Sequence, residues 1–380
     1  MDGITFDQIE AAGLEGWLIR LGEELRAKTY RCQPVRRVMI PKAGGGERPL
    51  GIPTIRDRVV QTAAKLVLEP IFEADLDSAA HGYRPGRSAG QAIQAVLMLL
   101  RQDYTDVVDA DLSKYFDSIP HDELMACLAR RIVDADMLRL VKLWLKAPVD
   151  TTGGDGKRRL EGGRTSKAGV PQGGVISPLI ANLYMNRFLK YWRQSAGARL
   201  SRRRSSITRT ILSFSAADSG CGIGMDGSCD DAVGSYPEPT KTRLCDARSE
   251  RFDFLGYSFG PHCFRPKGRW YLGASPSKKS VQRLKDRVGD ILVPGNMGRW
   301  EEVRDTLNRL LRGWCCYFSP GTHYAVDRAI EAHVSDCVRH FLARRHKMPA
   351  RSIGPFSRTA VFGHLGVPRL SACRRPGVLS

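Results

Sequence analysis

One carboxylate, Asp111, directly follows a short apolar stretch, 105–110, that the sequence predicts to be a β-strand. An aromatic residue, Phe116, comes five positions later. A carboxylate at a strand end can hold Mg²⁺, and a nearby aromatic ring can form a wall beneath the sugar of a nucleotide. Many α/β proteins contain a strand that ends in Asp, so the meaning of this spacing depends on the rest of the chain.

The composition points to a polyanionic partner. The 380 residues carry a formal net charge of +19, and the pI is near 9.7, which indicates nucleic acid most simply and a basic protein of another kind as the alternative. Ten Cys are scattered without zinc spacing, and no signal peptide or bilayer-length apolar run occurs. We therefore expect a cytoplasmic protein with reduced thiols and no membrane partner.

Two basic segments precede the predicted strand. Residues 34–53 predict a β-hairpin with a glycine tip, which carries Lys42 before the turn and Arg48 after it. These two cations could close over a triphosphate, or the hairpin could simply be basic and solvated. The Gly/Pro-punctuated loop at 81–90 carries Arg84 and Arg87, which suit phosphate contact; a solvated turn is the alternative.

A glycine-rich turn, Gly169 to Gly174, follows the predicted strand. Adjacent glycines let the backbone approach a base pair, and Gln172 offers an amide for hydrogen bonding. A plain turn before a helix at 175–192 is the alternative. Elsewhere the pattern predicts one helix within residues 1–30, a helix capped by Asp57, an apolar helix that follows the loop at 81–90 and runs to Leu100, helices at 122–146 and from 276 onward, and a polar loop at 151–167.

With these pieces in order, the chain resembles the reverse transcriptases of bacterial group II introns. The matching strings are VRRVMIPKAGGGERPLGIPTIRDRVVQ, HGYRPGRSAGQAI, VVDADLSKYFDSIPHDEL and GVPQGGVISPLIANLYMNRF, extended by KTRLCDARSERFDFLGYSF and LNRLLRGWCCYF. The resemblance implies an α+β right-hand polymerase. Its helical fingers would occupy 1–104, its palm with an antiparallel sheet 105–275, and its helical thumb or maturase region, with a basic tail, 276–380.

The resemblance also implies a set of site residues. Asp111 would be the catalytic, metal-binding carboxylate, and Leu112 would offer its carbonyl to the metal and line the nucleotide site. Phe116 would exclude a ribose 2′-OH. The other nucleotide-binding residues would be Lys42, Arg48, Gln172, Gly173 and Lys241, and the RNA-binding residues Arg84, Arg87, Arg312, Arg344, Arg345 and Lys347. Asp109 shares the strand face of Asp111 but matches no ligand position, so we expect it to be structural.

The implied reaction is a two-metal attack of a primer 3′-OH on the α-phosphate of a dNTP, with Mg²⁺ as cofactor and RNA as template. The implied partners are group II intron RNA, a DNA target or primer, and dNTPs. The resemblance further implies an assisting role in intron splicing. The sequence shows no endonuclease-like Cys pairs at its end, and its beginning is shorter than in most relatives, which suggests truncation or a misplaced start.

The interval from about 197 to 239 departs from the family pattern. Relatives carry a Tyr-Ala-Asp-Asp hairpin here, which supplies the second set of metal-binding carboxylates. This chain has no such tetrad, and we expect no apolar strand–turn–strand in the interval. The pair Asp230-Asp231 is the nearest substitute, but only about ten residues separate it from Lys241. A helix would not fit in that space.

A shift of reading frame accounts for this interval. Residues 206–216 can be back-translated so that the same bases, read two nucleotides later, encode Asn-Tyr-Ala-Asp-Asp-Phe-Val-Ile-Leu-Ser. The hidden Asp pair would fall at about 209–211. We hypothesise that 197–239 is translated out of frame, through compensating indels or a sequencing error. The DNA sequence decides, because codons that encode the tetrad in no frame would refute this hypothesis.

The sequence therefore predicts an RNA-directed DNA polymerase and maturase whose activity is impaired by the missing Asp pair. The alternatives are a catalytically dead intron-RNA-binding maturase and a decayed gene product that folds poorly. RNA-templated incorporation of dNTPs separates the first from the others, and salt-dependent binding of intron RNA separates the second from the third.

Overall fold

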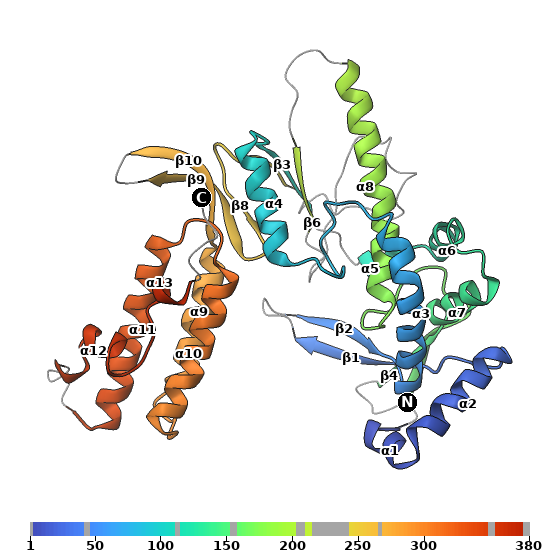
Figure 1. Ribbon diagram of the computed structural model, residues 1–380, viewed down its shortest axis with the longest axis horizontal. Coiled ribbons are helices and arrows are strands. Elements are labelled where there is room, and N and C mark those ends of the chain that lie inside the picture. Colours follow the sequence, from blue (N-terminus) through green and yellow to red (C-terminus); the bar gives the residue numbers. More distant parts are fainter. Residues whose placement is uncertain are drawn as a thin grey trace. The chain divides into compact units, whose positions relative to one another are not determined.

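The computed structural model describes residues 3–41, 46–110, 115–152, 158–202, 210–214, 243–264, 268–348 and 354–374. These residues form two units that mix helices with strands (Figure 1), as the α+β prediction requires. Unit 1 holds the described residues within Met1–Ser88, Ala110–Ile207 and Phe214–Thr242; unit 2 holds those within Ala89–Asp109, Thr208–Ser213 and Arg243–Ser380. The units therefore divide the expected palm segment between them.

The N-terminal part of unit 1 contains two helices where the sequence predicted one. These are α1 (Phe6–Ala11) and α2 (Leu14–Arg26). Gly13 between them has a φ of 93°, a conformation that an α-helix cannot contain. A capping box formed by Thr5 and Gln8 fixes the start of α1.

A four-stranded sheet in unit 1 has the order β2-β1-β4-β5. The predicted hairpin is confirmed, because its two strands pair in antiparallel register. The stretch predicted as a polar loop instead contains the end of β4 and all of β5, and β4 runs parallel to β1 as its second neighbour. The strands are β1 (Val35–Pro41), β2 (Glu47–Ile52), β4 (Pro148–Thr152) and β5 (Arg158–Gly162).

The remaining helices of unit 1 surround one apolar core, in which Phe72, Ile119, Leu124 and Tyr184 are buried. Thr54, not Asp57, caps the third helix, because the Thr54 hydroxyl accepts the Asp57 N–H. The helices are α3 (Ile55–Glu73), α5 (Tyr115–Ser118), α6 (His121–Ala129), α7 (Ala135–Leu145) and α8 (Ser177–Arg202).

Unit 2 contains two three-stranded sheets, with the orders β6-β3-β7 and β10-β9-β8. Helix α4 (Ala89–Arg101), predicted from its apolar spacing, shares a core with them through Ile93, Val107, Cys245 and Phe259. The strands are β3 (Asp106–Ala110), β6 (Thr210–Phe214), β7 (Arg243–Asp246), β8 (Phe252–Phe254), β9 (Tyr257–Phe264) and β10 (Arg269–Pro276).

The predicted helical region after residue 276 forms the rest of unit 2. Three long helices pack through buried residues such as Val288, Leu307 and Val338. The elements are α9 (Lys278–Ile291), α10 (Trp300–Tyr317), α11 (Tyr324–Arg345), the short 3₁₀ helix η2 (Gly354–Phe356), α12 (Arg358–Phe362) and α13 (Leu370–Cys373). Among the described residues, no helix combines the length and hydropathy that a bilayer crossing requires.

Candidate nucleic-acid site

The GVPQGG loop (169–174) joins two parts of unit 1. On one side it binds the segment that contains the short helix α5. The Val170 N–H donates to the Phe116 carbonyl at 2.6 Å, and the Gly169 N–H donates to the Ile119 carbonyl at 2.9 Å. Both bonds are backbone to backbone, so the position of the loop fixes the backbone beside Phe116.

On its other side the loop binds the hairpin. The Gly51 N–H in β2 donates to the Gln172 carbonyl at 2.5 Å. Gly173 has a φ of +106°, and a Cβ atom there would lie 2.4 Å from the Gly51 carbonyl oxygen. Glycine is therefore required at this approach. The side chain of Gln61 in α3 accepts the Val175 N–H at 2.9 Å and fixes the end of the loop.

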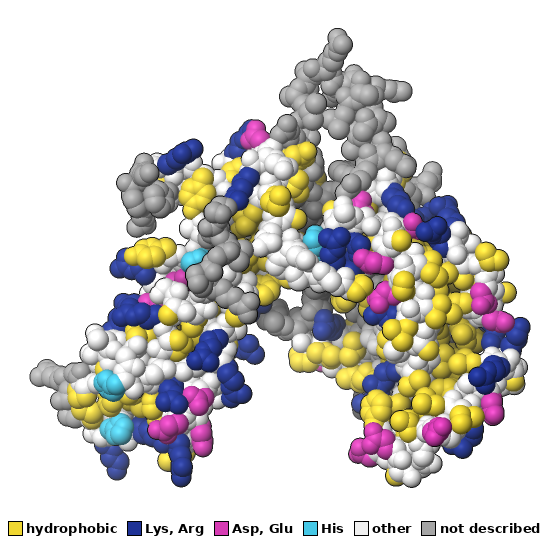
Figure 2. Space-filling model, viewed as in Figure 1, with side chains coloured by type: hydrophobic (Ala, Val, Ile, Leu, Met, Phe, Trp, Pro, Cys, Tyr) yellow, Lys and Arg dark blue, Asp and Glu magenta, His cyan; other side chains and the backbone are white. Residues whose placement is uncertain are grey.

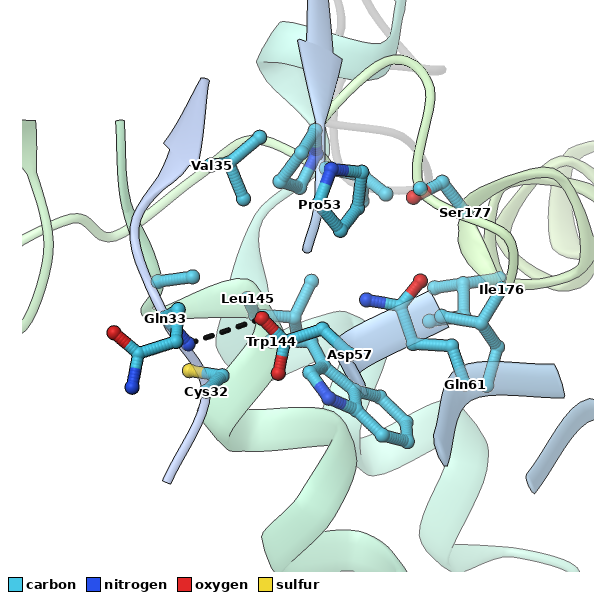
Figure 3. A pocket seen from close by; sticks show the side chains of 15 residues that line it. Cys32, Gln33, Val35, Pro53, Asp57, Gln61, Trp144, Leu145, Ile176 and Ser177 are labelled. Carbon is cyan, nitrogen blue, oxygen red and sulfur yellow. Dashed lines mark hydrogen bonds between the residues drawn. The ribbon is translucent and has the colours of Figure 1, made fainter. Parts of the chain in front are cut away.

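A buried polar network lies at the base of the hairpin, and Figure 3 shows its Gln33–Asp57 hydrogen bond. Asp57 accepts hydrogen bonds from the Tyr30 hydroxyl at 2.6 Å, the Thr54 hydroxyl at 2.8 Å and the Gln33 N–H at 3.1 Å. The indole N–H of Trp144 donates to the Tyr30 oxygen at 3.3 Å. Burial and then the Asp57 charge raise the pKa of Tyr30, so its hydroxyl stays protonated and can donate.

The cavity beside this network is small. It has a volume of about 20 Å³ and is lined by Asp57, Gln61, Trp144 and Pro171 among others. That space suffices for about one water molecule. The network consequently stabilises the base of the hairpin. The cavity is too small to bind a nucleotide.

Four of the nucleotide-site residues expected from the sequence lie in unit 1. Phe116, Gln172 and Gly173 are connected through the hydrogen bonds and close approach of the GVPQGG loop. Arg48 lies on β2, three positions before the Gly51 contact, and is half-buried. The other four, Lys42, Asp111, Leu112 and Lys241, lie outside the described residues.

The predicted strand before Asp111 is confirmed as β3. It pairs antiparallel with β7, and Asp109 lies opposite Arg243 in this register. This cross-strand pair of opposite charges supports a structural role for Asp109. Within the described ranges, no group of three or more His, Cys, Asp and Glu side chains is placed to hold a metal ion.

The aberrant interval contains one strand that we did not expect. Strand β6 lies beside β3 at the edge of the sheet. Its sequence, Thr-Ile-Leu-Ser-Phe, is rich in residues that favour strands, which explains its formation. The five residues include no carboxylate. The candidate pair Asp230-Asp231 lies outside the described residues.

The two arginines of the loop at 81–90 differ in exposure. Arg84 is buried, and its guanidinium donates to both oxygens of Glu73 and to the carbonyls of Asp77 and Ala80, at distances from 2.5 to 3.1 Å. It anchors the loop and is not available to a phosphate, contrary to our expectation. Arg87 is exposed, so the expected phosphate contact stays a prediction for Arg87.

The expected RNA-binding residues of unit 2 lie on the surface. Arg312 is exposed on α10, and Arg344 and Lys347 are exposed at the end of α11 and just beyond it. Arg345 is exposed as well, but it donates to the Gly298 carbonyl at 2.5 Å, which restrains its head group.

A cationic ridge on α9 was missed by our sequence analysis. We define it as Lys279, Arg283 and Arg287, which are exposed at i, i+4 spacing on one face. None of the three has an ion-pair partner among the described side chains. Figure 2 shows Lys and Arg side chains spread over the helices of this unit. The regular spacing of the three cations was the available sequence signal.

The basic C-terminal segment is partly folded against α11. Buried Asp327 pairs with Arg374 at 2.6 Å, and buried Glu331 lies 3.3 Å from Arg358 and 4.0 Å from Arg369. These arginines are therefore committed to the fold, whereas the sequence indicated only that the tail is basic. The two acids lie one turn apart on α11, and the sequence did not show that they face the segment.

Other contributors to the loop were also missed. Gln61 belongs to a helix for which the sequence predicted only a cap at Asp57, and His121 gave no sequence signal of a contact with the loop. Gly51 gave no signal beyond its place in a strand. Their roles depend on contacts between segments more than 40 residues apart in sequence, which local patterns do not contain.

Comparison with known proteins identifies two regions. Residues 40–212 match the family "Reverse transcriptase (RNA-dependent DNA polymerase)". Residues 281–354 match "Group II intron, maturase-specific domain". The first match ends within the aberrant interval, and neither match covers 213–280.

Curated relatives give the same result. The chain is 40% identical to Protein YkfC of Escherichia coli over 199 residues, which is 50% of this chain and 49% of that protein. It is 34% identical to the group II intron-encoded protein LtrA of Lactococcus lactis over 175 residues, 44% of this chain and 27% of LtrA. The chain thus spans half or less of these relatives.

Among solved structures, the telomerase of Candida albicans is similar with a TM-score of 0.43 and 11% identity, over 97% of this chain and 70% of that one. A TM-score of this size is too low to carry an argument. The identification depends on the order of the two family matches and on the chain's similarity to an intron-encoded relative. This chain belongs to the group II intron reverse transcriptase and maturase family.

Proposed function

We propose that this chain binds group II intron RNA and assists its splicing, on a reverse transcriptase fold whose RNA-directed DNA polymerase activity is impaired. The observation that carries the proposal is the succession of the two matches, reverse transcriptase and then maturase, in one chain. The net charge of +19 supports a polyanionic partner.

The α9 ridge and its surroundings are the RNA surface in this proposal. Arg283, Arg287, Arg312 and Arg344 fall within the maturase match and are exposed. Exposed cations bind phosphates with release of counterions, so they supply affinity that depends on salt but not on sequence. Arg87 would add a phosphate contact from unit 1.

The nucleotide site in this proposal is built around the GVPQGG loop. Arg48, with Lys42 and Lys241, would hold the triphosphate of a dNTP, and Gln172 with Gly173 would contact the template nucleotide. Phe116 would exclude a ribose 2′-OH. The hydrogen bonds that fasten the loop to both the hairpin and the Phe116 backbone support this arrangement, because a fixed site orients its substrate without further reorganisation.

The donor set for Mg²⁺ is only partly present. Asp111, with the Leu112 carbonyl, directly follows β3 and offers the oxygen ligands that Mg²⁺ prefers. Mg²⁺ would stabilise the charge that develops when a primer 3′-OH displaces pyrophosphate. A two-metal site needs a second set of carboxylates, and β6 carries none. This deficit is the basis for impairment.

A catalytically dead RNA-binding maturase is the second candidate. The end of the reverse transcriptase match at residue 212 favours it, because the match stops inside the interval 197–239, where the family pattern places the second carboxylates. Primer extension separates the candidates. Incorporation that Asp111→Ala abolishes supports an impaired polymerase, and no incorporation supports the dead maturase.

Binding of the intron RNA at a series of KCl concentrations tests the RNA-binding proposal. We expect log K to fall linearly with log salt concentration. A variant in which Lys279, Arg283 and Arg287 are replaced by Gln should have a shallower slope, by about 0.7 to 0.9 for each phosphate that is no longer neutralised. Gln282→Ala, on the same helix without a charge change, is the control. An unchanged slope in the triple variant would exclude the ridge as an RNA surface.

A further inference from the structure

His121 holds the GVPQGG loop from the side of Phe116. Its backbone N–H donates to the Lys167 carbonyl at 2.9 Å, and its ring Nε2 lies 2.7 Å from the Gly169 carbonyl oxygen. A carbonyl only accepts, so Nε2 must carry the proton and donate. The side chain is 3% exposed, and its Nδ1 makes no hydrogen bond within the described part of the chain.

The two bonds of His121 lie just before the residue that contacts Phe116. Gly169 accepts from the imidazole and donates its own N–H to Ile119, and the next residue, Val170, donates to the Phe116 carbonyl. Gly169 has a φ of +104°, and because glycine adopts many backbone conformations readily, its hydrogen bonds select this one. His121 thus restrains the backbone that places Phe116.

The same loop transmits this restraint to the hairpin. Two residues beyond Val170, the Gln172 carbonyl accepts the Gly51 N–H, and Gly173 leaves no space for a shift towards β2. A displacement of Gly169 would therefore alter both the backbone beside Phe116 and the approach of the loop to the hairpin.

We propose that His121 is a positioning residue that sets nucleotide specificity through the GVPQGG loop. This inference rests on the proposed function, because it assumes that Phe116 senses the sugar and Gln172 the template base. His121 does not itself touch the nucleotide. Its imidazole acts through the Gly169 carbonyl, and the property that matters is a donor at the Nε2 position.

A purely space-filling role makes a different prediction. If His121 only filled the core, any side chain of similar volume would replace it. If its donor matters, loss of the donor leaves a buried carbonyl without a partner and releases the loop. The substitutions His121→Gln and His121→Met form a matched pair, because the Gln amide can reach the position of Nε2 and Met has a similar length but no donor.

The first measurement is hydrogen–deuterium exchange of the full-length chain, in peptides that cover residues 167–176 and 48–52. We expect His121→Met to increase exchange in both peptides, and His121→Gln to resemble the parent. Equal exchange in the two variants would overturn the proposal. This arm requires no ligand, so it does not depend on the proposed function.

The second measurement is nucleotide binding to the chain on an RNA template with a primer that lacks a 3′-OH, so that turnover is not required. We expect the preference for a complementary dNTP over the matching rNTP to fall about fivefold in His121→Met, which corresponds to ~1 kcal/mol, and to be restored in His121→Gln. Loss of dNTP and rNTP binding by equal factors in His121→Met would overturn the specificity role.

The two arms separate the failure of this inference from that of the proposed function. If the parent does not distinguish a complementary from a mismatched dNTP, the nucleotide site of the proposed function fails, and so does the specificity role of His121. The exchange difference between Gln and Met would then still support the restraint of the loop by His121. If the parent discriminates and the two variants behave alike, only the His121 inference fails.

Discussion

The α9 ridge and the C-terminal segment are both basic and both belong to unit 2, yet their cations do different things. Lys279, Arg283 and Arg287 are exposed and have no ion-pair partner among the described side chains. Arg358, Arg369 and Arg374 pair with the buried acids of α11. Net charge therefore does not show which cations are available to RNA; the carboxylates that face them do.

The largest effect should come from the most buried pair. Arg374 and Asp327 are each 8% exposed in their side chains. Arg374→Ala leaves a buried carboxylate with less compensation, so we expect the free energy of unfolding to fall by about 3–5 kcal/mol. Urea denaturation measures it. Arg304→Ala, which removes a partly exposed pair with Asp305, is the control and should cost about 0–1 kcal/mol. Equal losses in the two variants would contradict the comparison.

The loop at 81–90 contains the same contrast on a smaller scale. Arg84→Ala removes a buried guanidinium that is bonded to Glu73 and two carbonyls, and should lower the unfolding free energy by about 2–4 kcal/mol. Arg87→Ala removes an exposed side chain and should change stability by less than about 0.5 kcal/mol. Thermal or urea unfolding of the two variants checks this, and RNA affinity should fall only modestly in Arg87→Ala. Similar stability losses in the two variants would contradict the distinction between a buried Arg84 and an exposed Arg87.

The dependence of stability on pH gives a third test. Burial opposes ionisation of Asp327, but hydrogen bonds from His323 and Arg374 and the charge of Arg374 outweigh it and lower its pKa. A folded-state pKa below the unfolded value of ~3.9 means that Asp327 stabilises the fold above that pH, and that this stability is lost as the pH falls through the folded-state pKa. Urea unfolding between pH 6 and 3 should show a shallower loss in Asp327→Asn than in the parent. Parallel curves would exclude this contribution.

A small effect should come from a half-exposed member of the C-terminal segment. Arg369 lies 4.0 Å from Glu331, and its side chain is 52% exposed. We expect Arg369→Gln to lower stability by about 0.5 kcal/mol and to leave the salt dependence of RNA binding unchanged. The matched variant Arg283→Gln should leave stability unchanged and reduce the salt dependence of RNA binding. A reduced salt slope in Arg369→Gln would show that the segment binds RNA after all.

Sequence patterns anticipated those features that depend on local chemistry. The hairpin, β3 and α4 follow from alternating or helical apolar spacing. Gly173 was expected to allow a close approach to a base pair, whereas the close approach in the structure is to Gly51 of the hairpin. The break at Gly13 and the strand β5 were missed, because the first depends on one residue with positive φ and the second on pairing with a neighbouring strand. Arg84 was misjudged because its partner Glu73 faces it only in the folded loop.

The missing carboxylates show a further limit of such reasoning. Strand β6 forms beside β3 because backbone pairing and β-favouring residues suffice for it. Metal binding, in contrast, needs particular side chains at particular positions. A strand can therefore form next to β3 although its sequence lacks the carboxylates expected there. Only the residue identities at 209–214 reveal their loss.

Primer extension by the parent protein and by Asp111→Ala tests the central claim most directly. The assay contains an RNA template, Mg²⁺ and dNTPs. Both proteins should bind the intron RNA with the same salt dependence. We predict that the parent protein incorporates dNTPs at most slightly faster than Asp111→Ala. Incorporation far above that of Asp111→Ala, lost again when Asp230 and Asp231 are replaced by Asn, would contradict the account, because it would mean that this chain does supply a second set of carboxylates.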